Sequence, residues 1–290
     1  MRHFRRKPID RIGSEDVAAL MRAKLREGLA HSTVHHILNV LGGTFKHSVK
    51  RGWAETNPVR GVERPPAPHV NPDIRFLDMN EVAKLIAAVP EDTVGGMERA
   101  LYLTAALTGL RQGELVALRW ADVDWLTGVV RVRRNYTRKE WGTPKSRRSS
   151  RAVPMPTQVA AELERHFQRS AHQADTDLVF CHPETGNAYD ASKLRKRFKQ
   201  ALNTAGVREV RFHDLRHTYA TRMAAAGTPI RTLQEYLGHR DSRTTSIYAD
   251  YAPDPTQGAV FTARAFGDEL LVEPVSTPTE PRQTVVSGRP

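Results

Sequence analysis

The stretch RFHDLRHTYATRM, residues 211–223, predicts a helix that carries a histidine and an arginine on one side. His213 and Arg216 are three positions apart, and side chains at this spacing project from the same helix face. Both can therefore reach one anion, and a planar guanidinium donates two parallel hydrogen bonds to phosphate oxygens. The pair alone is weak evidence, because histidines and arginines in helices are common and usually solvated.

A second segment, LGHRDSRTTSIY (residues 237–248), ends on a tyrosine. Gly238 predicts the end of a helix, so His239 either hydrogen-bonds the last carbonyls of that helix or serves a ligand. Tyr248 is a candidate nucleophile, whereas a tyrosine in a short helix is ordinarily a core or interface residue. A phenol with a pKa of about 10 needs cations or a base to react at neutral pH. Tyr251, one helical turn later, is the alternative.

A third segment, TGLRQGELVALRW (residues 108–120), places Arg111 after a glycine turn and at the start of a helix. The positive end of a helix dipole favours an anion beside that guanidinium. Taken alone, Arg111 fits a surface arginine paired with Glu114 better. Two arginines, two histidines and a tyrosine are nonetheless the groups that can attack a phosphodiester without a metal.

Together these three segments resemble the tyrosine recombinase, or phage integrase, family. The resemblance assigns charge neutralisation of the scissile phosphate to Arg111 and Arg216. It assigns His213 and His239 to moving or holding protons, with His239 hydrogen-bonded to that phosphate. Tyr248 is the implied nucleophile, because it follows His239 by nine residues, the interval usual in the family.

The resemblance also implies a lysine on a β-hairpin that protonates the leaving 5′-oxygen. Lys145, in TPKSRRSSRAVPM (residues 143–155), is the expected general acid, and Lys139 is the alternative. A lysine at either position could instead contact DNA phosphates. Glu114 resembles an acidic residue of the family and is expected to orient Arg111. No metal and no cofactor are expected, because the 12 histidines and the single cysteine lack the spacing of a metal site.

Composition restricts the partners and the location of the chain. Its 290 residues contain 44 lysines and arginines against 32 acidic residues, a net charge of +12. This surplus favours a polyanionic partner, most often nucleic acid. Cys181 is the single cysteine, so no disulfide can form within the chain, which suits a reducing cytosol. Without a long apolar run or a signal peptide, a cytoplasmic protein with no membrane contact is expected. The resemblance implies a bacterial or phage origin and association with DNA.

The hydrophobic periodicity predicts a mainly α-helical fold with a small antiparallel β-sheet. Two amphipathic helices are expected within residues 14–51, and four prolines in residues 64–72 predict an extended linker. Further helices are expected at about 78–89, 97–107, 156–169, 191–205, 213–226 and 229–237. A β-hairpin around residues 122–132, a basic loop over 139–151 and a strand after it interrupt the helices.

The resemblance assigns functions to these regions. Residues 1–63 correspond to a core-binding DNA-binding domain, 64–75 to the linker, 76–265 to the catalytic domain and 266–290 to a largely disordered tail. Core-binding domains of the family usually have four or more helices, so residues 1–63 are either a minimal form or lack an N-terminal piece. Residues 258–272 predict an amphipathic helix that packs on a neighbouring protomer or on its own domain.

The expected reaction is site-specific strand exchange on double-stranded DNA through a 3′-phosphotyrosyl intermediate, in DNA integration and DNA recombination. A free monomer would assemble as a homotetramer on DNA, with accessory DNA-bending or directionality proteins as further partners. Three other interpretations stay open from the sequence. A decayed integrase could act as a DNA-binding regulator, a type IB topoisomerase-like enzyme could relax supercoils, and a basic protein could bind RNA, although no RNA-binding motif supports the last.

Overall fold

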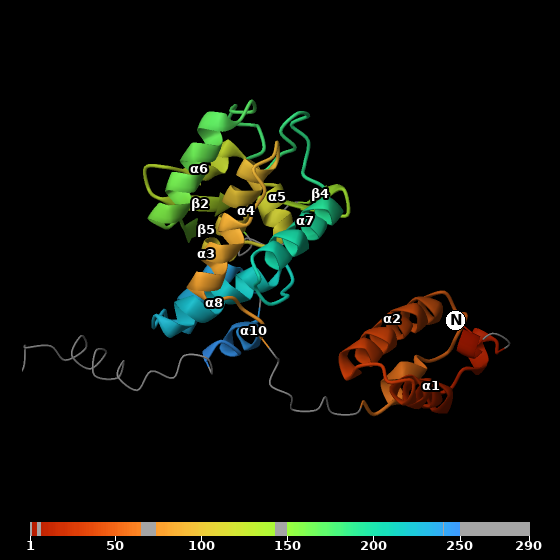
Figure 1. Ribbon diagram of the computed structural model, residues 1–290. Coiled ribbons are helices and arrows are strands. Elements are labelled where there is room, and N and C mark those ends of the chain that lie inside the picture. Colours follow the sequence, from red (N-terminus) through yellow and green to blue (C-terminus); the bar gives the residue numbers. More distant parts are fainter. Residues whose placement is uncertain (1, 5–6, 65–73, 143–149, 240, 250–290) are drawn as a thin grey trace, which may run out of the picture. The chain divides into compact units, whose positions relative to one another are not determined.

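The computed structural model describes residues 2–4, 7–64, 74–142, 150–239 and 241–249 (Figure 1). The chain divides into two compact units, Met1–Asp73 and Ile74–Pro290, and each has a hydrophobic core of its own. The division falls within the proline-rich segment that is expected to be a linker. Each unit therefore buries its apolar side chains independently.

The first unit is helical. It contains the 3₁₀ turns η1 (Arg2–Phe4), η2 (Ile9–Arg11) and η3 (Pro58–Gly61) and the helices α1 (Ser14–Arg26) and α2 (His31–Lys50). Apolar side chains at helical spacing form its core, among them Val17 and Leu20 of α1 and Val34, Leu38 and Phe45 of α2. The prediction of two helices within residues 14–51 is confirmed.

In the second unit, helix α4 lies in the core. The helices are α3 (Met79–Ala87), α4 (Gly95–Thr108), α5 (Gln112–Val116), α6 (Thr157–Arg169), α7 (Ala191–Thr204), α8 (Asp214–Ala225), α9 (Ile230–Leu237) and α10 (Arg243–Ser246), with a 3₁₀ turn η4 (Trp120–Asp122). Helix α4 is buried along most of its length and packs against α6 and α8 (Figure 1). Tyr102 of α4 contacts Phe198 and Phe212 edge-on, which joins α7 and the residues before α8 to the same core. None of the helices in the described ranges is both long and apolar enough to span a membrane.

A small antiparallel sheet follows α5 in the sequence. Its strands, in the order of pairing, are β1 (Val123–Asp124), β2 (Val129–Val132) and β5 (Arg151–Pro154). Val130 and Val153 lie opposite each other and are fully buried, so this sheet joins the core of the second unit. The mainly helical fold with a small antiparallel sheet is therefore confirmed.

A second hairpin lies where the sequence predicts a basic loop. It consists of the strands β3 (Asn135–Thr137) and β4 (Glu140–Gly142). The aromatic rings of Tyr136 and Trp141 pair across these strands with their centroids 4.7 Å apart, which stabilises the hairpin. The prediction of a continuous loop over 139–151 is therefore wrong for residues 140–142.

Two of the turns of the second unit that favour glycine follow α4 and α9. Gly109 follows α4 with a φ of 64°, and Gly238 follows α9 with a φ of 62°, in the left-handed region that residues with a side chain rarely adopt. A Cβ atom at Gly109 would lie 2.4 Å from the ring of Tyr219, and one at Gly238 would lie 2.9 Å from the guanidinium of Arg151. Both turns thus allow close approach of a side chain from elsewhere in the fold.

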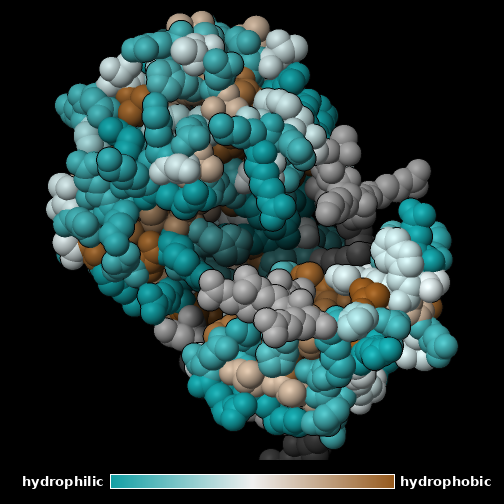
Figure 2. All heavy atoms as spheres, turned by 90° about the vertical axis from the view of Figure 1, so that its right-hand side faces the viewer, coloured by the Kyte–Doolittle hydropathy of each residue, from teal (hydrophilic) through white to brown (hydrophobic). Residues whose placement is uncertain are grey.

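Hydrophilic side chains cover most of the face shown in Figure 2. The large exposed hydrophobic side chains of the described residues are few: Val40, Val49 and Trp53 in the first unit, and Met79, Trp125, Leu126 and Trp141 in the second. A few exposed apolar residues at a surface are ordinary and indicate no partner by themselves.

Candidate active site

Arg111 and Arg151 share one buried carboxylate, that of Glu114. Arg111 precedes α5; its Nη1 donates to Glu114 Oε1 at 2.9 Å, and its backbone N–H donates to Oε2 at 2.8 Å. Arg151, the first residue of β5, donates from Nη1 and Nη2 to the same two oxygens at 3.0 and 2.8 Å. The three-residue spacing predicts the first contact, but nothing in the sequence predicts the second, which joins residues 37 positions apart.

Glu114 holds this cluster together as a carboxylate. Burial by itself would raise the pKa of Glu114, but the hydrogen bonds and charges of Arg151 and Arg111 outweigh burial and lower the pKa to about 2. Nε of Arg151 donates to the carbonyl oxygen of Tyr236 at 2.6 Å, and Nη2 of Arg111 donates to that of Gly238 at 3.1 Å. The two arginines therefore connect α5 and β5 to the C-terminal end of α9.

Arg216 of α8 is almost completely buried, with 3% exposure. Its Nη1 donates to the carbonyl oxygen of Gly109 at 2.6 Å, and its Nη2 donates to that of Leu237. Burial, followed by the charge of Arg111, lowers the pKa of Arg216 to about 9, which leaves the guanidinium protonated at neutral pH. In the described part of the chain no carboxylate forms an ion pair with Arg216, so the fold does not neutralise its charge.

His239 lies directly after the glycine that ends α9. Its Nδ1 is 2.9 Å from the hydroxyl of Thr245, and Nε2 of Gln234 donates to its backbone carbonyl at 3.1 Å. Burial, followed by the charges of Arg216 and Arg111, lowers the pKa of His239 to about 3, so the ring is neutral at pH 7. When the Thr245 hydroxyl donates to Nδ1, the ring proton is on Nε2 and can be donated to an anion.

His213 precedes α8 and is exposed. Partial burial of its ring, followed by the charge of Arg216, lowers the pKa of His213 below the ordinary range. His213 and Arg111 line the same groove, together with Lys139 and Arg195. His213 and Arg216 therefore differ in exposure, and His213 is the one open to solvent.

Tyr248 lies two residues after α10 and is buried, with 1% exposure. Its Oη is 2.7 Å from Nδ1 of His217. Burial raises the pKa of Tyr248 to about 12, and the charge of nearby Arg216 acts in the opposite direction. Tyr248 is predicted from the sequence to belong to the site, whereas His217 is not, although it lies within the stretch RFHDLRHTYATRM. Its partner is 31 positions away, so only the fold reveals the contact.

Lys145, Tyr251 and the segment 258–272 all lie outside the described residues. Lys139 is described, at the turn between β3 and β4 with a φ of 63°. It lines the groove that also contains Arg111, so one of the two lysines considered as general acid is near the arginine cluster.

The described residues of this site combine surplus positive charge with neutral histidines. The guanidiniums of Arg111, Arg151 and Arg216 have one carboxylate among them, and buried positive charge favours an anionic ligand. An arginine fork matches the oxygens of a phosphate. The phenol of Tyr248 is close enough to Arg216 for their charges to interact. The site can therefore bind an oxyanion with a phenol near it.

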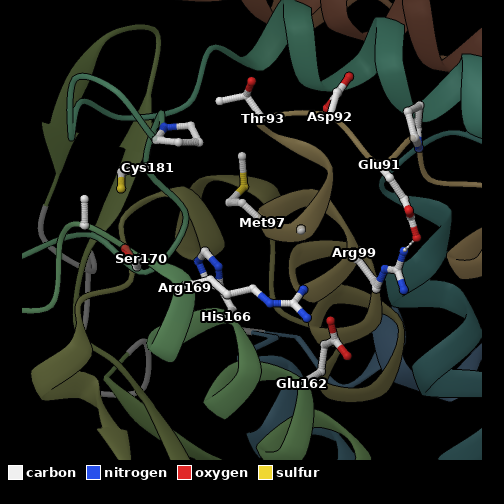
Figure 3. Close-up of a pocket in the computed structure, with 14 residues that line it drawn as sticks. Glu91, Asp92, Thr93, Met97, Arg99, Glu162, His166, Arg169, Ser170 and Cys181 are labelled. Atoms are coloured by element: carbon white, nitrogen blue, oxygen red, sulfur yellow. Dashed lines mark ion pairs between the residues drawn. The ribbon is translucent and has the colours of Figure 1, made fainter.

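A separate hollow lies between the start of α4 and α6 (Figure 3). Its lining includes Glu91, Arg99 and His166, and none of the site residues predicted from the sequence that the structure describes lines it. Arg99 and Glu91 form an ion pair at 3.9 Å, and Nε2 of His166 is 2.6 Å from the carbonyl oxygen of Val179. These polar groups contact partners within the fold, in contrast to the unpaired charge of Arg216.

Comparison with known proteins identifies the family. Residues 75–254, more than half of the chain, match the Phage integrase family. The chain is 32% identical over 266 residues to a tyrosine recombinase XerC-like protein of Caldanaerobacter subterraneus subsp. tengcongensis, which covers 82% of this chain and 67% of that protein.

Solved structures agree in fold. The Tn1549 transposon integrase in complex with transposon right end DNA superimposes with a TM-score of 0.69 at 20% identity, covering 89% of this chain and 86% of that one. A lambda integrase dimer bound to a COC′ core site gives a TM-score of 0.63 at 18% identity, covering 87% and 86%. From the family match and the XerC-like relative, this chain belongs to the phage integrase family and is a tyrosine recombinase, an enzyme that cleaves and rejoins DNA.

Proposed function

We propose that this recombinase cleaves double-stranded DNA with Tyr248 as the nucleophile. Its phenol oxygen attacks the phosphorus, and the bond between phosphorus and the 5′-oxygen breaks. The products are a 3′-phosphotyrosyl link and a free 5′-hydroxyl, and the 5′-hydroxyl of a partner strand then reverses the step. Because the link conserves the energy of the phosphodiester bond, strand exchange needs no nucleotide cofactor.

The observation that carries this proposal is the buried charge of Arg216, which has no carboxylate partner in the described ranges. A phosphate between Arg216 and Arg111 would supply the missing negative charge. That charge increases in the pentavalent transition state, where preorganised donors stabilise it most. His213, exposed along the groove, and His239, neutral beside the arginines, hold or move protons at the phosphate oxygens. Glu114 keeps Arg111 in position.

A suicide DNA substrate with a nick near the cleavage site tests the nucleophile. Tyr248→Phe loses only the phenol oxygen, so it should bind DNA as the wild type does and form no covalent adduct on a denaturing gel. Tyr251→Phe is the matched control and should form the adduct. An adduct that persists in Tyr248→Phe and disappears in Tyr251→Phe would assign the nucleophile to Tyr251.

Protonation of the leaving 5′-oxygen is the proposed role of Lys145, with Lys139 as the alternative. A 5′-bridging phosphorothiolate leaves as a thiolate and needs no acid. Lys145→Ala should therefore cleave normal DNA slowly and the phosphorothiolate at a rate near that of the wild type. Lys139→Ala should cleave both substrates normally. Selective rescue of Lys139→Ala instead would transfer the role to Lys139.

The helical first unit is the proposed core-binding domain, residues 1–63, joined by the linker 64–75 to the catalytic domain. Lys46 and Lys50 of α2 and Arg51 directly after it are exposed, and such side chains can contact DNA phosphates. Each neutralised phosphate contributes roughly 0.9 to the slope of log affinity against log salt. Replacing these three residues by alanine should therefore reduce that slope.

Strand exchange between two duplexes requires four cleavages and hence four active sites. The proposed assembly is a free monomer, two protomers on each DNA site and a tetramer in the synapse, with accessory DNA-bending or directionality proteins as further partners. The lambda integrase relative, a dimer on its core site, supports two protomers per site. Residues 258–272 are the proposed contact between protomers. Deletion from residue 258 onward should spare single-site binding and prevent tetramers in analytical ultracentrifugation, whereas tetramers of the truncated protein would exclude this contact.

A further inference from the structure

His217 contacts the hydroxyl of Tyr248 directly. Nδ1 of His217 and Oη of Tyr248 are 2.7 Å apart, a short hydrogen bond, and the ring centroids are 5.8 Å apart. Both groups are enclosed, since Tyr248 is 1% exposed and the side chain of His217 is 19% exposed. His217 is one helical turn after His213 on α8. The contact therefore joins the proposed nucleophile to the helix that also carries the buried Arg216.

Charged and titratable groups of α8 and the residues before it surround His217. Oδ1 of Asp214 is 4.0 Å from Nε2 of His217, and Asp214 is itself paired with Arg211. The ring of His213 lies edge-on at 5.5 Å, and the charge of Arg216 also acts on His217. Burial, partly offset by Asp214, lowers the pKa of His217, so its ring is neutral at pH 7.

A neutral imidazole has one donor and one acceptor nitrogen. Nε2 of His217 is 4.0 Å from Oδ1 of Asp214, too far for a hydrogen bond, so the carboxylate acts on the ring through its charge. With its proton on Nε2, the ring leaves Nδ1 to accept the hydrogen bond of Tyr248. A carboxylate whose charge favours the imidazolium, and a ring nitrogen within hydrogen-bond reach of the reacting hydroxyl, suit a general base.

The phenol of Tyr248 needs such an acceptor. Burial raises its pKa to about 12, so spontaneous ionisation at neutral pH is rarer than for an exposed tyrosine. His239 is less suited, because its Nδ1 contacts Thr245 and because burial and the neighbouring arginine charges lower its pKa to about 3. In the described ranges no hydrogen bond joins His213 to the hydroxyl.

We propose that His217 is the general base that accepts the proton of Tyr248 during attack on the phosphate. As the bond between Oη and phosphorus forms, the O–H bond breaks and the proton moves to Nδ1, which gives an imidazolium. The 5′-oxygen leaves with the electron pair of its bond to phosphorus and takes a proton from the general acid. In the reverse step the bond between Oη and phosphorus breaks, and the imidazolium returns its proton to the departing oxygen of Tyr248. This inference rests on the proposed role of Tyr248 as nucleophile.

A resting lock is the other interpretation of the same contact. In this interpretation Tyr248, which is 1% exposed, leaves His217 before it attacks the phosphate, and the hydrogen bond between them holds it back. The two interpretations predict opposite results. Removal of a base slows cleavage, whereas removal of a lock accelerates it.

Single-turnover adduct formation by the full chain tests the base. A suicide substrate with a 5′-bridging phosphorothiolate isolates this step, because its leaving group needs no acid. His217→Ala removes the acceptor, and His217→Asn retains an oxygen that can accept the hydrogen bond but cannot take the proton. Both variants should be slower by on the order of 10²–10⁴ at pH 7. The wild-type rate should level off above the pKa of His217, whereas both variants should gain about tenfold per pH unit.

His172→Asn is the matched control in the same unit, because Nε2 of His172 is 3.1 Å from the carbonyl oxygen of Pro183, and it should keep the wild-type rate and pH profile. Unchanged DNA binding and melting temperature of His217→Asn would exclude misfolding. If either variant is unstable, the pH dependence of the wild-type cleavage rate still tests the inference. A wild-type rate that rises with pH without reaching a plateau would contradict the role of His217 as general base.

Two results would overturn the inference: a wild-type rate and pH profile in His217→Asn, or faster cleavage in His217→Ala. An adduct formed by Tyr248→Phe would refute the proposed nucleophile instead. The failure of this inference and the failure of the proposed function are therefore distinguishable.

Discussion

Arg151 and Arg216 are two buried guanidiniums of one cluster, but their charges have different partners. Arg151 forms a double ion pair with Glu114. Arg216 donates to the carbonyl oxygens of Gly109 and Leu237 and has no carboxylate partner within the described chain. The first charge is neutralised inside the protein, and the second is not.

This difference separates a cation that supports the fold from one that is available to a ligand. A buried ion pair is stabilising only while both partners are present, so Arg151 and Glu114 depend on each other. A buried cation without a counter-ion destabilises the free protein and is stabilised when an anion binds. We infer that Arg216 binds the phosphate strongly for the same reason that it contributes little to stability.

Among the variants of this arginine cluster, Arg216→Ala should have the largest effect on cleavage. Removal of one preorganised donor to the transition state typically lowers the rate by on the order of 10²–10³. DNA binding should change far less, because other phosphate contacts supply most of it. Arg216→Lys should also be slow, since lysine keeps the charge but lacks the planar fork. Single-turnover cleavage and a binding titration at fixed salt measure both effects, and near-normal cleavage by Arg216→Ala would remove this residue from the site.

The fold follows from local sequence signals wherever the contacts are local. Asp78 and Glu81 cap α3 reciprocally, as their spacing of three residues predicts. The β3–β4 hairpin carries no such signal. Its turn residues, Arg138 and Lys139, have φ angles of 56° and 63°, which Asn or Gly would favour and these residue types do not. The pairing depends instead on aromatic side chains across the strands.

In the candidate site, the sequence motifs identify the residues but not their partners. Glu114 and Arg151 are 37 positions apart, and His217 and Tyr248 are 31 apart, so both contacts depend on how the helices pack. Arg151 belongs to a basic stretch of the sequence, and nothing local distinguishes it from its neighbours. Burial decides its role, and burial is a property of the tertiary structure.

Arg151→Ala should lower the free energy of unfolding more than Arg216→Ala does. It leaves Glu114 with half of its ion pairs among the described residues, and breaking a buried pair costs on the order of 3–5 kcal/mol. Arg216→Ala removes an uncompensated charge and should cost less. Urea denaturation of both variants and the wild type measures the difference. Equal losses would mean that the two arginines have the same structural role.

The lowered pKa of Glu114 predicts a smaller, pH-dependent part of the stability. The pKa is about 2 in the folded chain against an ordinary value of 4.5, so this contribution is fully present above pH 4.5 and is lost as the pH falls through the folded pKa. At about 1.4 kcal/mol per pKa unit it amounts to roughly 3 kcal/mol or less. The variant Glu114→Gln has no carboxylate at this position, so it lacks this pH-dependent contribution. The difference in unfolding free energy between the wild type and Glu114→Gln should therefore shrink from pH 4.5 toward pH 2, and a constant difference would contradict the ion pair.

Gly238→Ala should have the smallest effect of the four and should act through Arg151. Gly238 has a φ of 62°, and an added Cβ would lie 2.9 to 3.3 Å from side-chain atoms of Arg151. The left-handed conformation costs a residue with a side chain roughly 1–2 kcal/mol. The guanidinium of Arg151 also has to shift away from the added Cβ. This shift would disturb Glu114, and Glu114 in turn holds Arg111. We expect a loss of about 1–2 kcal/mol in urea denaturation and a reduction in cleavage rate well below that of Arg216→Ala.

Gly206→Ala separates these two consequences. Gly206 also has a φ of 62°, but an added Cβ there would meet no atom within 4 Å. It should lose a similar amount of stability and cleave at the wild-type rate. Slower cleavage by Gly238→Ala than by Gly206→Ala would show that a displaced Arg151 lowers the cleavage rate through its contact with the Glu114 carboxylate. Equal cleavage rates of the two variants would mean that Arg151 contributes to the stability of the fold and not to the reaction. Of Arg151 and Arg216, only Arg216 would then act in cleavage.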